Sequence, residues 1–115
     1  MEIYDKAHEL AEAVQACKEY QDLVEAGKTL AKDEKTTKLV REFLLWQTQL
    51  AYAQSMGDKP VRKKIEQLNR LSELVKNNQL AVDYLQKYNA WQSIAGEVFQ
   101  IIQQSMAEGM SILDQ

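Results

Sequence analysis

Few side chains in this chain of 115 residues have the type and spacing that catalysis requires. The segment His8-Glu9-Leu10-Ala11-Glu12 is close to the helical zinc-protease motif, but that motif needs a second histidine one helical turn after the first. Glu12 stands in that place, and the chain has one histidine in all, so a set of zinc ligands cannot be completed. The sequence predicts no metal site and places His8 and Glu12 on an exposed polar face.

Cys17 is the single cysteine of the chain. A catalytic thiol needs a base beside it, and His8 lies more than two helical turns earlier. One thiol forms no internal disulfide and cannot supply the several thiolates that a zinc or iron–sulfur centre needs. No glycine-rich phosphate loop of the P-loop or dinucleotide type is present. We therefore expect a protein that is not an enzyme, has no cofactor and resides in a reducing cytoplasm.

One segment has a local excess of positive charge. Residues 58–76 contain six basic and three acidic side chains, a balance of +3 in a chain whose net charge is −3. Such a face suits RNA or an acidic partner. However, Arg62 and Glu66 are spaced as an ordinary helical ion pair, and the aromatic side chains that would stack on bases lie mainly elsewhere. An RNA-binding face is thus the alternative hypothesis, and its residues are Lys59, Arg62, Lys63, Lys64 and Arg70.

The composition indicates helices rather than strands. Apolar residues make up 45% and charged residues 27%, as in an ordinary globular domain, and the length fits one domain over residues 1–115. Four glycines and one proline are too few for the turns of a β protein, which recur about every 8 to 12 residues. The N-terminus lacks the pattern of a signal peptide, and no segment approaches the roughly 20 apolar residues of a membrane span.

Apolar periodicity and capping signals predict an all-α fold of about five helices. Asp33 and Asn78 are good N-caps, and Gly57 supplies the left-handed residue that ends a helix. Asp58 and Pro60 form a further start signal, Asn77 a stop signal, and Gly27 a point where a helix can bend. The predicted helices cover residues 3–16, 18–31, 34–56, 60–76 and 79 to about 109.

The last helix carries few charges. Residues 79–115 contain five charged side chains, and the apolar positions cover more than one stripe, which requires burial on more than one side. With 30 residues or more it would reach about 45 to 50 Å, whereas a compact domain of this length has a radius of gyration of about 13 Å.

We expect a hairpin of the third and fourth helices, with the fifth packed along it and across to a partner in an oligomeric helical bundle. Packing within one subunit is the other interpretation of the same face. The predicted interface residues of the last helix are Tyr84, Tyr88, Trp91, Ile94, Ala95, Val98, Ile101 and Ile102.

Several positions together resemble the bacterial YlbF/YmcA/YheA family of small helical proteins, in its short YheA-like branch. The resemblance spans nearly the whole chain, and it rests on Ile3-Tyr4-Asp5-Lys6-Ala7 with Leu10, Glu19-Tyr20, Asp33, Phe43, Gln47 and Tyr84-Leu85. It implies a self-associating cytoplasmic protein without known catalysis. It also implies that Cys17 stands where relatives often have a capping serine, which weakens that helix start by about 1 kcal/mol.

Some longer relatives are subunits of a complex that regulates competence, sporulation and biofilm formation and assists an endoribonuclease in maturing messenger RNA. Relatives with a cysteine-bearing C-terminal tail are associated with iron–sulfur binding. This sequence reaches Gln115 without such cysteines, so no cluster is expected. The prediction is a non-catalytic, homo-oligomeric interaction or regulatory protein, dimeric or higher, with a protein partner in a regulatory complex as a further expectation. The alternative is an RNA-associated accessory factor that uses the basic face of residues 59–76.

Overall fold

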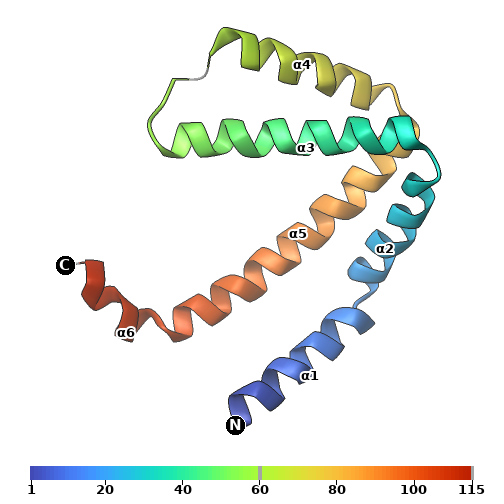
Figure 1. Ribbon diagram of the computed structural model, residues 1–115. Helices are drawn as coiled ribbons and strands as arrows, with labels where there is room; N and C mark the ends of the chain where they lie inside the picture. The colour runs from blue at the N-terminus through green and yellow to red at the C-terminus, as the bar shows by residue number, and fades with distance from the viewer. Residues whose placement is uncertain (60, 115) are drawn as a thin grey trace.

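The computed structural model describes residues 1–59 and 61–114. Every regular element in this part of the chain is helical, which confirms the all-α prediction. Two short elements at the C-terminal end were not predicted as separate helices. The elements are α1 (Glu2–Ala16), α2 (Lys18–Ala31), α3 (Glu34–Ser55), α4 (Arg62–Lys76), α5 (Gln79–Ser105), α6 (Ala107–Met110) and the 3-10 turn η1 (Ser111–Asp114) (Figure 1).

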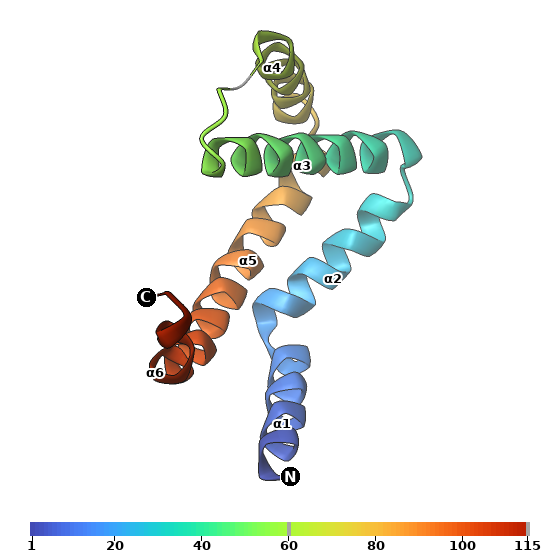
Figure 2. The same ribbon diagram turned by 60° about the vertical axis from the view of Figure 1, so that its left-hand side comes forward.

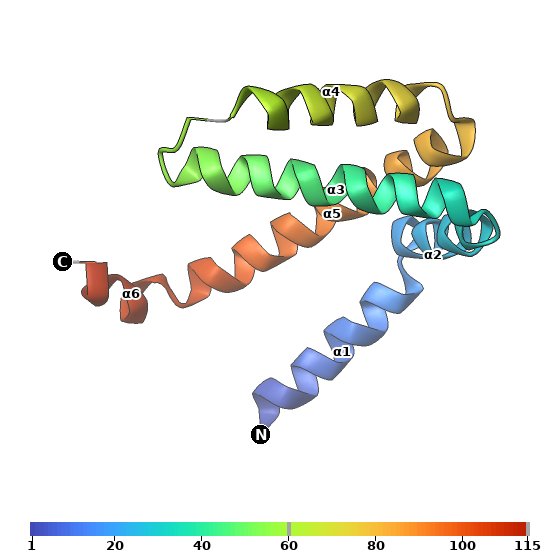
Figure 3. The same ribbon diagram turned by 45° about the horizontal axis from the view of Figure 1, so that its top comes forward.

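The helices form an open, flat arrangement. Helices α3 and α4 lie side by side as an antiparallel hairpin, which was predicted. Helix α5 leaves the open end of that hairpin, opposite the α3–α4 connection, and runs away from it (Figures 1 and 3). Helix α2 packs antiparallel to α5, and α1 continues beyond α2 (Figure 2). The principal extents are 47 × 38 × 16 Å. The molecule therefore has two diverging arms that meet where α2, α3 and α5 join.

Two N-caps are linked at this junction. The Asp33 carboxylate accepts a hydrogen bond from the backbone N–H of Thr36 at 3.0 Å, and the Asn78 side-chain oxygen accepts one from the N–H of Ala81 at 3.1 Å. The Asn78 amide nitrogen also donates to the Thr36 hydroxyl at 3.0 Å, and Thr36 is buried. One polar network thus satisfies free N–H groups at the starts of both α3 and α5 and ties the two helices together.

The hydrophobic core is small and lies beside this network. Its buried residues come from α2, α3, α4 and α5 and are Leu30, Val40, Val75, Ala81 and Leu85. The radius of gyration is 18.0 Å, well above the roughly 13 Å of a compact domain of this length. One chain leaves much of its apolar surface uncovered.

Most helix ends in the structure agree with the capping residues predicted from the sequence, but some do not. Gly57 adopts φ +80° directly after the α3 C-cap, as predicted. The predicted start of the fourth helix is wrong, since α4 begins at Arg62 with Val61 as its N-cap and no side-chain cap, and Pro60 lies outside the described residues. Asn77 ends α4 as expected, but at φ −91° rather than in the left-handed region. Its side-chain nitrogen donates to the Glu73 carbonyl at 3.1 Å, and the same carbonyl accepts the Asn77 backbone N–H at 3.3 Å.

Two expectations for the last helix are corrected. Helix α5 has 27 residues and ends at Ser105, while Gly109 lies inside the separate helix α6. The principal neighbour of α5 is α2, and each helix of the α3–α4 hairpin contacts α5 less extensively. The contact between α2 and α5 includes Gly27, where an added Cβ atom would lie 3.7 Å from the Tyr84 ring, an ordinary van der Waals distance. Helix α2 remains one continuous helix through Gly27.

Alanine at Gly27 is expected to stabilise the protein by about 0.5 to 1 kcal/mol, because alanine loses less backbone entropy in a helix interior. The added methyl group would make an ordinary van der Waals contact with Tyr84. Gly57→Ala is the matched control, since its positive φ disfavours any Cβ and should cost about 1 kcal/mol. Urea denaturation measures both. If both substitutions changed the free energy of unfolding by the same amount in the same direction, this explanation would be wrong.

Candidate protein-interaction surface

The side chains considered for chemistry stand apart from one another. His8 is exposed on α1, and among the described residues no group of three or more His, Cys, Asp or Glu side chains is arranged to hold a metal ion. Cys17 sits between α1 and α2 in an extended conformation, with φ −69° and ψ 129°. Its thiol donates to the Glu19 carboxylate at 3.1 Å rather than accepting from the backbone, and this hydrogen bond lowers the pKa of Glu19. The hydrogen-bond partner of the thiol is thus a carboxylate two residues later in the chain rather than His8.

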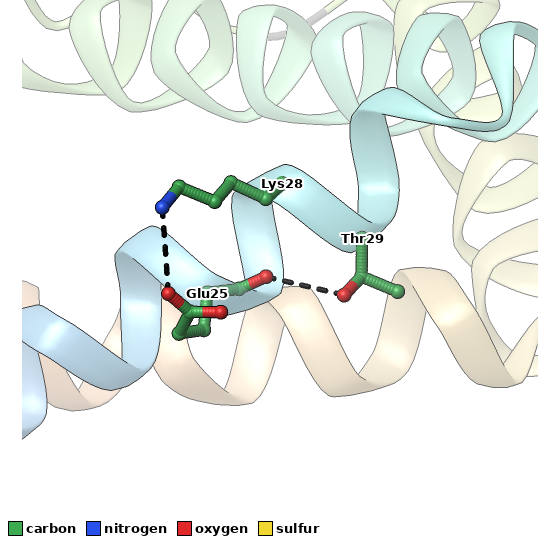
Figure 4. A network of polar contacts seen from close by, with 3 residues as sticks. All are labelled: Glu25, Lys28 and Thr29. Atoms are coloured by element: carbon green, nitrogen blue, oxygen red, sulfur yellow. Dashed lines mark hydrogen bonds and ion pairs between the residues drawn. The ribbon is translucent and has the colours of Figure 1, made fainter.

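The outward face of α2 is an ordinary solvated face. Lys28 pairs with Glu25 at 3.5 Å, and the Thr29 hydroxyl donates to the Glu25 carbonyl at 3.2 Å (Figure 4). Each of these three residues is exposed, so the contacts contribute little to stability. Within residues 1–59 and 61–114, no helix is both long and apolar enough to cross a bilayer.

The first part of the predicted α5 interface is used inside the subunit. Trp91 packs edge-on against Tyr20 of α2, with ring centroids 5.2 Å apart, and Tyr84 lies beside Gly27. Tyr88 follows one turn later, with its ring 6.1 Å from that of Tyr84. Burial raises the pKa of Tyr84, and the neighbouring Tyr88 adds to the shift. These aromatic side chains hold α2 to α5, which matches the alternative interpretation of packing within one chain.

The second part of α5 lacks such cover. Ile94, Ala95 and Val98 are half-buried, whereas Ile101 is 67% and Ile102 is 41% exposed. Phe99 was not among the predicted interface residues, yet it is 60% exposed. Its spacing of three residues from Ile102 was the signal that could have identified it. The uncovered apolar surface therefore lies toward the C-terminal end of α5.

A shallow apolar cavity of about 170 Å³ joins this part of α5 to α1. We call it the α1–α5 groove, and its lining residues are Val14, Trp91, Ala95, Val98, Phe99 and Ile102. On α1, only Val14 is half-buried, while Ile3, Tyr4 and Leu10 of the same helix are exposed. An amphipathic helix whose apolar side faces solvent needs cover from another element. The groove and the apolar side of α1 thus form one candidate interaction surface.

The predicted basic face lies on the other arm of the molecule. Lys59 and Lys64 line a cavity of about 310 Å³ at the closed end of the α3–α4 hairpin, beside the connection between the two helices. We call this cavity the hairpin cleft. Arg62 pairs with Glu66 at 3.1 Å, as the spacing indicated, and Lys63 and Arg70 are exposed. Sequence reasoning separated aromatic from basic residues, but the fold places Trp46 in the same cleft as the two lysines. The full lining is Trp46, Gln49, Leu50, Ala53, Asp58, Lys59, Val61 and Lys64.

Known proteins share this arrangement. A solved structure described as a protein of unknown function (DUF964) from Bacillus stearothermophilus superposes with a TM-score of 0.72. It shares 21% sequence identity with this protein, and the match covers 94% of this chain and 95% of that chain. At this level of identity the similarity shows the fold alone.

Sequence relatives cover similar lengths. A UPF0342 protein of Clostridium tetani is 25% identical over 111 residues, which are 96% of each chain. A UPF0342 protein of Desulfitobacterium hafniense is 31% identical over 86 residues, covering 75% of this chain and 69% of that protein. The family model described as "Control of competence regulator ComK, YlbF/YmcA" matches residues 3–107. This chain therefore belongs to the YlbF/YmcA family, as its capping and apolar positions indicated.

Proposed function

We propose that this protein is a non-catalytic, cytoplasmic interaction protein that works as a homo-oligomer, with the α1–α5 groove as its principal contact between copies. One observation carries the proposal: the single chain exposes far more surface than a compact protein of its size, including many large apolar side chains. Large exposed side chains occur along α1 and along the second part of α5, where no element of the described chain covers them. Contiguous apolar surface of this kind marks a protein-interaction site.

The size of the surface supports a stable assembly. The accessible area of the chain is 9324 Å², whereas a compact monomer of 13.2 kDa has about 6,400 Å². The excess is about 2,900 Å² per chain, or about 5,800 Å² for two chains, which is enough surface for even the large interfaces of obligate homodimers. A second copy suits the groove because both contacting surfaces are then apolar, and a two-fold axis lets the exposed apolar side of α1 in each copy cover the groove of the other.

Sedimentation velocity at micromolar concentration tests the proposal. The expected result is one species at twice or a higher multiple of 13.2 kDa, with helical circular dichroism. A well-folded monomer over the whole concentration range would end the proposal. The description of the family supports a regulatory role, which a protein without an active site exercises through contacts with other proteins.

RNA association is the second candidate, and the position of Trp46 beside Lys59 and Lys64 favours it. A stacking surface beside basic side chains is the arrangement that single-stranded RNA binds. The test is RNA binding at low salt that weakens as salt is raised and disappears on reversing the charges of Arg62, Lys63 and Lys64. Absence of binding at low salt would remove this candidate.

A further inference from the structure

The hairpin cleft has a chemistry different from that of the α1–α5 groove. Trp46, Leu50 and Val61 give it an apolar floor, and Lys59 and Lys64 lie among its lining residues with one acidic side chain, Asp58. Val61 remains 56% exposed although it sits between two helices. A volume of about 310 Å³ is at the lower end of the range for binding pockets. The cleft suits an apolar segment that also carries negative charge.

The C-terminal segment of the chain has this chemistry. Its apolar side chains Met110, Ile112 and Leu113 are 58%, 66% and 76% exposed. No basic residue follows Lys87 in the sequence, whereas Glu97, Glu108 and Asp114 do. The region from residue 88 to 115 therefore carries a formal charge of −3, opposite to the +3 of residues 58–76. Charge and apolar character both match those of the cleft.

The segment does not reach the cleft of its own chain. Among the described residues, η1 has close backbone contacts with α6 alone, and α6 has them with η1 and α5 and with no other helix. In all three views, the C-terminal segment and the α3–α4 connection nevertheless lie toward the same side of the molecule (Figures 1, 2 and 3). Because the C-terminal segment lies on the same side as the hairpin cleft without contacting it, the segment of one copy can bind the cleft of another copy.

We propose that the C-terminal segment of a second copy, residues 106–113, occupies the hairpin cleft. Ile112 and Leu113 then cover Trp46, Leu50 and Val61, and Glu108 faces the lysines. The inference rests on the proposed self-association and adds a second contact to it. A two-fold axis allows both copies to make the contact at once, which closes the dimer, whereas a one-way contact would continue into a ring or a filament.

Disulfide cross-linking between two tagged forms of the full chain tests this contact. One form carries Gln49→Cys in the cleft, the other carries Ser111→Cys in the segment, and both carry Cys17→Ser, which removes the native thiol. Gln49 and Ser111 are exposed, so the substitutions should preserve the fold. Mild oxidation of the mixture is expected to give a linked pair of unlike chains. Two exposed sites serve as controls, Ala7→Cys on α1 and Lys38→Cys on the opposite end of α3, and each should link to the Ser111→Cys form at least about tenfold less.

Charge reversal adds a rescue test. Lys59→Glu with Lys64→Glu in the cleft form should weaken the linking about tenfold, the effect of losing a few exposed charge contacts. Glu108→Lys in the segment form should weaken it by a smaller factor and should restore linking when combined with the reversed cleft. Preferred linking to Ala7→Cys, or no rescue, would overturn the inference.

The same samples separate this inference from the proposed function. If sedimentation shows an oligomer but no disulfide forms between the cleft and the segment, the proposed cleft contact is wrong and the proposed contact through the α1–α5 groove is retained. If the chain is monomeric, both are wrong. RNA and the C-terminal segment would compete for the same cleft. If RNA binds the cleft and the cross-linking between the two forms does not change, the segment is excluded as the occupant.

Discussion

Replacing Phe99 and Ile102 together by glutamate is expected to convert the assembled protein into a folded monomer. Both side chains line the α1–α5 groove, and they are 60% and 41% exposed within one chain. Removing two apolar side chains from a buried interface costs about 4 kcal/mol, and placing carboxylates there adds to the loss. The dissociation constant should rise by about 1,000-fold or more in sedimentation experiments.

The control for this variant is Gln100→Glu with Gln103→Glu, which adds the same charge at exposed positions of the same helix. It should leave the mass of the assembly unchanged. Trp91 is less suitable for such a test, because its contact with Tyr20 holds α2 to α5 inside the subunit. A Phe99 and Ile102 variant that sediments like the unchanged protein would show that the copies meet through another surface.

Asn78→Ala is expected to cause the largest loss of stability among single polar substitutions, about 2 kcal/mol. The change removes the N-cap of α5, worth about 1 kcal/mol, and the amide donor to the buried Thr36 hydroxyl, worth about 1 kcal/mol more. Asn78→Ser keeps an oxygen that can cap the helix and loses the donor, so it should cost about half as much. The free energy of unfolding in urea measures both variants.

The neighbouring Asn77 provides a matched control. Its side chain donates to the Glu73 carbonyl at an exposed position, so Asn77→Ala should cost less than about 0.5 kcal/mol. Because assembly adds to apparent stability, all variants should be compared at one protein concentration. Equal losses for Asn77→Ala and Asn78→Ala would mean that the link between the starts of α3 and α5 contributes nothing measurable.

The sequence by itself determined the class of the fold and most of the helix ends. Asp33 and Asn78 each accept a hydrogen bond from the backbone N–H three residues later, and Gly57 acts through its own φ angle. Such signals depend on near neighbours in the chain, so they can be recognised without a structure. The excess of apolar over charged residues in the last helix also indicated that one chain leaves a face uncovered.

Only the tertiary structure decided which helices meet. The apolar pattern of α5 does not specify its neighbour, and the fold pairs it with α2, which brings Tyr20 against Trp91 and Gly27 beside Tyr84. The closeness of Trp46 to Lys59 and Lys64 arises from the α3–α4 hairpin, which joins residues far apart in the sequence. The apolar periodicity of a helix shows which of its faces is buried but not which helix covers that face. The choice depends on how the side chains of the two helices fit together. For this reason the predicted interface of the last helix divides into an inner part that binds α2 and an outer part, around Phe99 and Ile102, that faces solvent.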